Sequence, residues 1–175
     1  MEWLERRFGD APLNIVHLQG NYGSSAQAGR SASLDEGLRR NPHWTLAARD
    51  SGDFTQAKGQ ELVEAYLAQG IRFDVIFAEN DNMAYGAIDA LKNAGLTPGK
   101  DVTIVSFDAN RKALELVMAG EISYDVECNP LHGPRVRAVI EQLEKGETPL
   151  KYTYVEENAF DGKGLSQELI DSRGY

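Results

Sequence analysis

Five polar or aromatic side chains stand at or just after the ends of apolar, strand-like segments of the sequence, and their types suit carbohydrate binding. They are Arg30, Phe54, Asn80, Asp108 and Glu127. Arginine, aspartate and asparagine carry planar groups that can each satisfy two adjacent hydroxyls, and an aromatic face can cover the apolar C–H side of a sugar ring. If the fold brings these residues to one edge of a sheet, they predict a carbohydrate-binding site.

Each of the five residues also has a purely structural interpretation. Asn80 and Asp108 could be simple helix caps. Arg30 could be an ordinary solvated or ion-paired residue, Phe54 part of the core, and Glu127 an exposed strand end. The binding-site interpretation is favoured by the expected position of all five at one edge of the sheet, more than by any single residue.

The same set of residues offers little for catalysis. No histidine stands at a strand end, so an acid/base pair with an orienting partner is missing. Asp108 and Glu127 could suggest glycoside hydrolysis. The neighbouring Arg30 and Asn80 favour ionised carboxylates, however, whereas that reaction needs one carboxyl kept protonated. We therefore predict no enzymatic activity and no catalytic residue.

Hydrophobic periodicity predicts the elements that position these residues. Strand patterns occupy residues 13–18, 45–48, 75–78, 102–107 and 122–126. Helical patterns lie between them, at about residues 25–40, 62–67, 83–94 and 113–117. This alternation with short connections predicts an α/β fold with a parallel, doubly wound sheet, right-handed crossovers and helices on both faces. Parallel strands place their carboxyl ends at one edge, where such sheets bind ligands.

The two ends of the chain break this rhythm. Residues 1–9 resemble the last turns of an amphipathic helix closed by a glycine, which suggests a chain that starts inside a longer protein. After Asn129 we expect a helix whose apolar stripe is Val136, Val139, Ile140 and Leu143, a strand at 151–155 and a short helix at about 165–170. One helix and one strand do not make a domain, so we expect them to complete a sheet formed elsewhere.

Composition excludes several classes of function. The net charge of −9 argues against a nucleic-acid surface, which needs clustered Lys and Arg. The apolar runs are strand-sized, far below the roughly 20 residues of a membrane span. The scattered His and Cys residues have no zinc-site spacing, so we predict no metal and no cofactor. Cys128 is the only cysteine, and we expect it to be a small buried residue.

Several motifs together resemble one known family, the periplasmic sugar-binding proteins of bacterial ABC importers, in the subgroup of ribose and galactofuranose binders. The matching segments are Ser51–Phe54, Ala78–Ala87, Gly95–Val102, Ser106–Asp108, Glu127–Pro130 and the final Arg173–Tyr175. The similarity covers nearly the whole chain, and the combination is more specific than any one motif.

The resemblance implies a two-lobed fold with the sugar clamped between the lobes, of which this chain has only part. Residues 1–10 would end a helix of the first lobe, residues 11–126 would form the second, sugar-binding lobe, residues 127–157 would return to the largely missing first lobe, and residues 158–175 would be a C-terminal tail. An isolated half of the clamp should bind sugar poorly, and its uncovered apolar stripe favours self-association.

Residue by residue, the resemblance assigns sugar contacts. Arg30, Asn80 and Asp108 match the family's hydroxyl ligands, Phe54 matches a pocket aromatic of ribose binders, and Glu127 falls where a hinge-side polar ligand lies. Two departures stand out. Residues 109–110 are Ala-Asn where many members have a glycine after the aspartate, which changes the expected pocket shape, and residues 33–34 are Ser-Leu where Gly-Phe is usual.

The implied function is that of the solute-binding component of a bacterial ABC importer, acting in the periplasm. Its ligand would be a monosaccharide, galactofuranose-like or a related aldose, and its partners would be the membrane subunits of the permease. Two alternatives stand beside this function. One is the effector-binding core of a LacI-type transcription regulator, which would have a basic helix-turn-helix upstream. The other is an extracellular sensor domain, which would lie near a membrane span.

Overall fold

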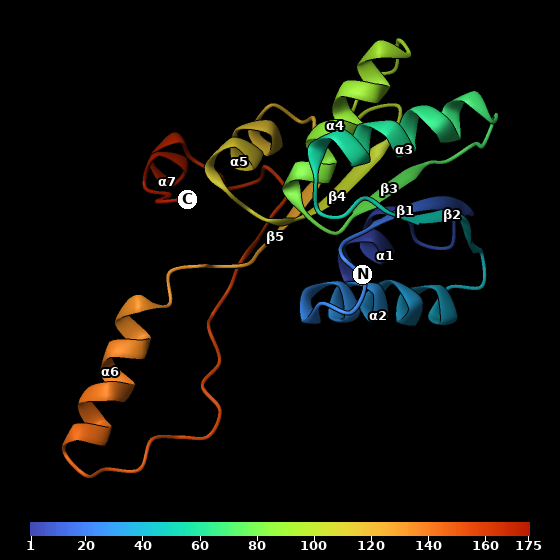
Figure 1. Cartoon of the computed structure of the whole chain (residues 1–175). Helices are drawn as coiled ribbons and strands as arrows, with labels where there is room; N and C mark the ends of the chain where they lie inside the picture. Colours follow the sequence, from blue (N-terminus) through green and yellow to red (C-terminus); the bar gives the residue numbers. More distant parts are fainter.

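A six-stranded β-sheet with helices on both faces forms the body of the molecule (Figure 1). The computed structural model describes all 175 residues. The strands are β1 (Leu13–Gln19), β2 (Trp44–Ser51), β3 (Val75–Ala78), β4 (Thr103–Asp108), β5 (Tyr124–Glu127) and β6 (Ala159–Phe160). The helices are α1 (Glu2–Phe8), α2 (Ser25–Arg40), α3 (Gln56–Ala68), α4 (Asp81–Asn93), α5 (Arg111–Met118), α6 (Gly133–Glu144) and α7 (Gln167–Asp171).

The strand order is β2-β1-β3-β4-β5-β6, and the pairs from β2 to β5 are all parallel. This confirms the predicted parallel, doubly wound sheet. Strand β6, which pattern reading did not predict, pairs antiparallel with β5 through two residues. All four βα junctions that carry predicted site residues therefore open at the same edge of the sheet, since parallel strands share their direction.

Strand β3 shows how the sheet is buried on both faces. Its side chains alternate, so Ile76 and Ala78 enter a core with α3, α4 and α5, while Val75 and Phe77 enter a second core with α1 and α2. All four are at most 1% exposed. A continuous apolar run of this kind is what a central parallel strand requires.

Helices α3 and α4 pack unusually closely, and glycine makes this possible. A Cβ atom at Gly86 would lie 2.0 Å from the main-chain oxygen of Gln56, and one at Gly59 would lie 2.5 Å from the main-chain oxygen of Met83. The contact brings the loop before α3 against the start of α4. The two segments that carry Phe54 and Asn80 are joined in this way.

Helix α1 corrects one expectation. Residues 1–10 were assigned to the first lobe, but α1 packs on the sheet of this lobe, where Leu4 is 2% exposed among Leu13, Ile15 and Leu34. Gly9 closes the helix with a positive φ of 54°, as predicted. The amphipathic pattern identified the helix and its end, but a single apolar stripe does not say which sheet it covers.

Residues 128–157, which we call the arm, leave the body after β5 (Figure 1). The arm contains α6, and none of its residues is buried. The predicted strand at 151–155 is wrong, because this segment pairs with no other strand. A β pattern forms a strand only when a neighbouring strand supplies hydrogen bonds.

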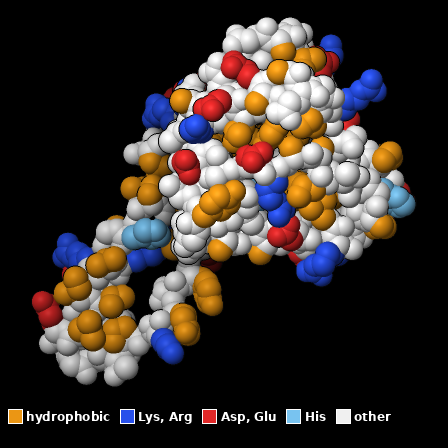
Figure 2. Space-filling view, turned by 45° about the vertical axis from the view of Figure 1, so that its right-hand side comes forward, with side chains coloured by type: hydrophobic (Ala, Val, Ile, Leu, Met, Phe, Trp, Pro, Cys, Tyr) orange, Lys and Arg blue, Asp and Glu red, His pale blue; other side chains and the backbone are white.

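The apolar stripe of α6 is exposed, as expected. Val136, Val139, Ile140 and Leu143 are between 38% and 57% exposed. Figure 2 shows these hydrophobic side chains gathered on the projecting part of the molecule. No helix of the chain combines the length and the apolar character that crossing a membrane would require.

Candidate functional site

Asn80 lies at the carboxyl end of β3 and is the N-cap of α4. Its Oδ1 accepts from the amide of Met83 at 3.0 Å, and its Nδ2 donates to the carbonyl of Phe54 at 3.1 Å. The residue is 6% exposed. The capping interpretation is therefore correct, and the residue also links two loops of the sheet edge. One amide hydrogen remains for a ligand.

Arg30 and Asp108 form an ion pair across the same edge. Nη2 of Arg30 lies 2.9 Å from Oδ1 of Asp108, and Nη1 donates to the carbonyl of Glu79. The guanidinium also lies 5.0 Å from the ring centroid of Phe107. Burial raises the pKa of Asp108, and the charge of Arg30 opposes this shift. The two groups present a cation and an anion side by side.

Phe54 lies in the loop between β2 and α3, with its ring against Gly20. A Cβ atom at position 20 would lie 1.9 Å from the ring, so only glycine permits this contact. The ring is partly buried and packs against the main core. Phe54 thus serves partly as a core residue, while its carbonyl holds Asn80.

Backbone strain concentrates at this edge. The only residues other than glycine with positive φ are Asp53 (51°), Phe54 (59°), Asp108 (116°) and Ala109 (53°). Such conformations are unfavourable for residues with a Cβ atom, and they cluster at functional sites. Ala109 thus adopts a glycine-like conformation at the position where the resemblance led us to expect glycine. We call Arg30, Phe54, Asn80 and Asp108 the rim.

Glu79 supports the rim, and pattern reading missed it. Its side chain is fully buried and accepts from Nε2 of His17 at 2.8 Å, Oγ of Ser31 at 2.6 Å and the amide of Gly20 at 2.7 Å. Burial lowers the pKa of His17, so this ring acts as a neutral donor. A glutamate directly after four apolar strand residues was the available signal, because a buried carboxylate needs such partners.

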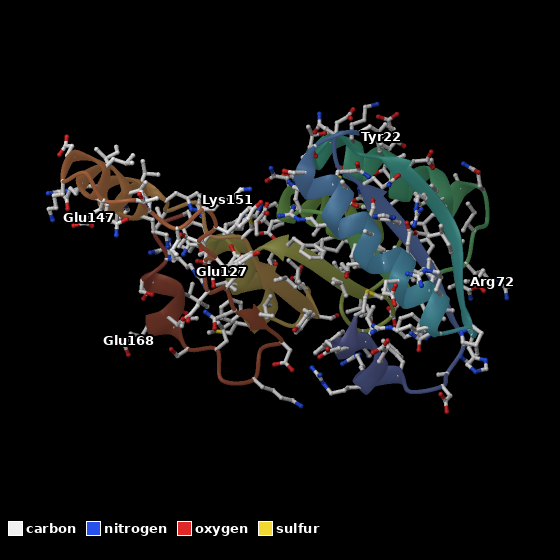
Figure 3. All side chains as sticks on the ribbon, turned by 90° about the horizontal axis from the view of Figure 1, so that it is seen from below. Tyr22, Arg72, Glu127, Glu147, Lys151 and Glu168 are labelled. Atoms are coloured by element: carbon white, nitrogen blue, oxygen red, sulfur yellow. The ribbon has the colours of Figure 1, made fainter.

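Glu127 differs from the other four predicted residues. It pairs with Asp108 in the β4–β5 register, but its side chain points to residues 158–175, which we call the tail. Its carboxylate accepts from Arg173, from the hydroxyl of Tyr175 at 2.7 Å and from the amide of Asn158 at 3.0 Å. Figure 3 shows it where the body, the arm and the tail meet.

The contacts of Glu127 leave it 5% exposed. Burial opposes its ionisation, but the hydrogen bonds from Arg173, Tyr175 and Asn158 outweigh burial and lower its pKa to about 2. The guanidinium of Arg173 in turn lies close to the rings of Phe160 and Tyr175, with centroid distances of 5.2 and 5.3 Å. The structure thus gives Glu127 the role of anchoring the tail and does not place it among the rim side chains.

Cys128 corrects another expectation, since it is exposed and not buried. Its amide donates to the carbonyl of Asp108 at 3.2 Å, and the thiol lies near Arg30. Partial shielding of the thiol from water raises its pKa, and the charge of Arg30 acts against this. Cys128 is the first residue of the arm, which explains its exposure.

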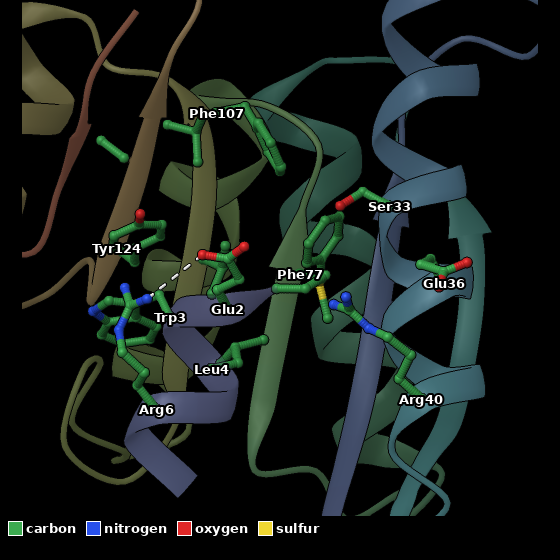
Figure 4. A pocket seen from close by; sticks show the side chains of 14 residues that line it. Glu2, Trp3, Leu4, Arg6, Ser33, Glu36, Arg40, Phe77, Phe107 and Tyr124 are labelled. Atoms are coloured by element: carbon green, nitrogen blue, oxygen red, sulfur yellow. Dashed lines mark ion pairs between the residues drawn. The ribbon is translucent and has the colours of Figure 1, made fainter. Parts of the chain in front are cut away.

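The apolar hollow shown in Figure 4 is separate from the rim. It has a volume of about 410 Å³ and is lined mainly by hydrophobic side chains under α1, including Trp3, Phe77, Phe107 and Tyr124. None of the five predicted site residues lines it. Nowhere in the chain do three or more His, Cys, Asp or Glu side chains gather in a way that could hold a metal ion.

Comparison with known proteins places these features in a family. The periplasmic binding protein domain model matches residues 1–132. The galactofuranose-binding protein YtfQ of Escherichia coli is 33% identical over 96% of this chain and 54% of its own length. The HTH-type transcriptional regulator AscG of the same organism is 35% identical over 57% of this chain and 26% of its own length.

Solved structures agree with this. A crystal structure of a galactofuranose binding protein superposes with a TM-score of 0.90 at 31% identity, over 98% of this chain and 59% of that one. A protein from Mycobacterium smegmatis in complex with β-D-fucofuranose gives 0.87 at 34% identity, over 93% and 54%. This chain spans about half the length of these relatives. It belongs to the periplasmic binding protein domain family.

Proposed function

We propose that this chain is the sugar-binding second lobe of the solute-binding component of a bacterial ABC importer, acting in the periplasm. In this proposal Arg30, Asn80 and Asp108 contact sugar hydroxyls, Phe54 packs beside the ring, and Glu127 supports the site from the hinge side. The membrane subunits of the permease are the partners of the loaded protein. The protein is a binding protein and catalyses no reaction.

The observation that carries the proposal is the concentration of polar partners and strain at one edge. Every positive-φ residue other than glycine lies in the two loops that hold Phe54 and Asp108. Asn80 and Arg30 join those loops to the end of β3. A fold keeps such conformations where a fixed arrangement of ligand-binding groups repays their cost.

Binding would proceed by closure of two lobes. Residues 11–126 form one wall of the cleft, and residues 127–157 return to the other lobe, whose sheet the exposed stripe of α6 would cover. A ligand that contacts both lobes favours the closed state by its additional interactions there. The single wall present in this chain should therefore bind an aldose more weakly than about 1 µM, which calorimetry on the isolated chain would check.

Substitution in the two-lobed protein tests the rim assignment. We expect Arg30→Ala and Asp108→Ala each to weaken sugar binding at least tenfold, about 1.4 kcal/mol. Arg72→Ala is the matched control, because Arg72 is exposed in the loop before β3, at the opposite end of the strands (Figure 3). Equal affinities of all three variants and the wild type, measured by calorimetry, would refute the assignment.

The ligand class follows from the relatives. Proteins similar to this chain bind galactofuranose and β-D-fucofuranose, so we propose a furanose or a related aldose. A thermal-shift screen of the two-lobed protein against a sugar panel tests this, because a ligand that binds only the folded state raises the melting temperature. A rise with furanoses, and none with unrelated polyols, is the expected result.

The match to AscG supports a second candidate, the effector-binding core of a transcription regulator. The rim would then bind an effector sugar, and closure would alter DNA binding elsewhere in the protein. The sequence upstream of Met1 distinguishes the two. A basic helix-turn-helix would favour the regulator, and a signal peptide followed by a first lobe would favour the importer component.

A further inference from the structure

Two buried carboxyl groups lie close together beneath the rim. Asp81 is the first residue of α4, directly after Asn80, and Asp125 lies in β5. Both residues are 0% exposed, and Asp125 is the β5 partner of Ser106, whose hydroxyl donates to Asp81 at 2.7 Å. The two carboxyl groups are close enough for each to influence the pKa of the other. Two neighbouring carboxyl groups in a buried site cannot both be ionised without a large energetic cost.

The donors around the pair decide which carboxyl is protonated. Asp81 accepts from Oγ of Ser106 at 2.7 Å and from the amide of Asn110 at 3.0 Å, so its ionised form is well supported. Neither oxygen of Asp125 receives a well-formed hydrogen bond from another residue, and the nearest donor is the backbone amide of Ala109, whose contact is too weak to count as a hydrogen bond by distance and angle. A buried oxygen needs a partner. If Asp125 is protonated, its hydroxyl can donate to the Asp81 carboxylate, and its oxygen then has the hydrogen-bond partner that it otherwise lacks.

The pair is connected directly to the strained turn of the rim. The amide of Asn110 that Asp81 holds follows Asp108 and Ala109, the two positive-φ residues after β4. The hydroxyl of Tyr85 holds the side chain of the same Asn110 at 2.7 Å. Three elements that carry or adjoin rim residues, α4, β4 and the start of α5, therefore meet at the Asp81 carboxylate.

We propose that Asp81 and Asp125 share one proton and act as positioning residues that hold Asn80 and Asp108 in their binding geometry, so that alkaline pH weakens ligand binding. The part that concerns ligand binding rests on the proposed sugar site. The part that concerns the shared proton does not.

Other charged groups near the pair do not replace this proton. Asp108 adds negative charge to the surroundings of both carboxyls, and its own partner is Arg30. On α5, the Lys112 ammonium lies 4.0 Å from the ring centroid of Tyr85 and makes no ion pair with either carboxylate. Strand β6, which pairs with β5 beside Asp125, contains no titratable residue.

The direction of the pH effect follows from the environment. Burial raises the pKa of Asp81 to about 6 and raises that of Asp125 well above its usual value. Because the folded-state pKa values are raised, the pair's contribution to stability is fully present below the unfolded value, near 4, and is lost as pH rises through about 6 and above. The two carboxyls titrate together, so the transition belongs to the pair.

Carboxyl ¹³C NMR of the 175-residue chain tests the shared proton without any ligand. We expect the Asp81 and Asp125 resonances to titrate together above pH 5.5. Hydrogen exchange at the Asn110 amide should quicken in the same range. In Asp125→Asn, whose amide can donate to Asp81 at every pH, the exchange rate should lose this added pH dependence. Ordinary titration of both residues near pH 4 would overturn the proposal, even if Asp125→Asn failed to fold.

Sugar affinity of the two-lobed protein tests the positioning role. We expect it to fall about tenfold between pH 5.5 and 8.5, equivalent to one pKa unit of coupling, and to stay level in Asp125→Asn. The control is Glu115→Gln, which removes an exposed carboxylate of α5 and should keep the wild-type profile. Identical profiles in wild type and Asp125→Asn would refute positioning and leave sugar binding standing. Absence of binding at every pH, with the joint titration intact, would instead refute the proposed function and the positioning role together.

Discussion

The body and the arm of this molecule are held by different means. The body and the tail contain all the buried residues, in three apolar clusters and a set of buried polar contacts such as those of Glu79. The arm has no buried residue and presents its apolar stripe outward (Figure 2). Both have amphipathic helices, so amphipathicity alone does not make a folded unit. A helix is stabilised mainly by the surface on which it packs.

The largest expected difference between body and arm lies in matched core substitutions. Ile76→Ala should lower the free energy of unfolding by about 2–5 kcal/mol, because it leaves a cavity at a fully buried site. Ile140→Ala, the same chemical change at a site 49% exposed, should stay within about 0.5 kcal/mol. Urea denaturation of both variants measures this. Similar losses in both would mean that the arm packs on the body in solution.

Glu127, at the junction between body and arm, should have a pH-dependent effect on stability that is smaller than the effect of Ile76→Ala. The pKa of Glu127 is lowered from 4.5 to about 2, so its stabilising contribution is present above pH 4.5 and is lost as pH falls through about 2. Melting temperatures measured between pH 5 and pH 2 should therefore fall more steeply in the wild type than in Glu127→Gln. The reason is that the variant has already lost the ion pair with Arg173.

If the melting temperatures of wild type and Glu127→Gln fall equally with pH, the tail is held without this carboxylate. A useful control is Glu157→Gln, which removes an exposed carboxylate bonded only to the amide of Asn129 in the arm. That variant should follow the wild-type curve, because its contact lies outside the body.

The smallest expected effect is weak self-association through the arm. Exposed apolar patches favour association, and the stripe of α6 provides one. Sedimentation velocity at rising concentration should show a growing dimer population, and Ile140→Asp should reduce it. Arg137→Asp is the control, since Arg137 is an exposed α6 residue outside the stripe. A strictly monomeric wild type would contradict this prediction.

Sequence reasoning predicted the parallel sheet because β3 and β4 are strongly apolar and each is followed by a helical pattern. It could not place the segment at 151–155, whose β pattern depends on a partner strand, or the sheet that α1 covers. At the rim, Arg30, Asn80 and Asp108 were predicted to share an edge because parallel strands force this. The supporting role of Glu79 and the proposed role of Asp125 depend on contacts between strands distant in sequence, which spacing does not show.

Asn80 combines two tasks in one side chain. Its oxygen caps α4 and its amide holds the Phe54 loop, while the proposed ligand contact uses the remaining amide hydrogen. A substitution that changes ligand preference here also uncaps a helix, which costs about 1 kcal/mol. Evolution or design toward a new ligand therefore meets a stability barrier at position 80. We expect new preferences to arise first at side chains that carry no structural task.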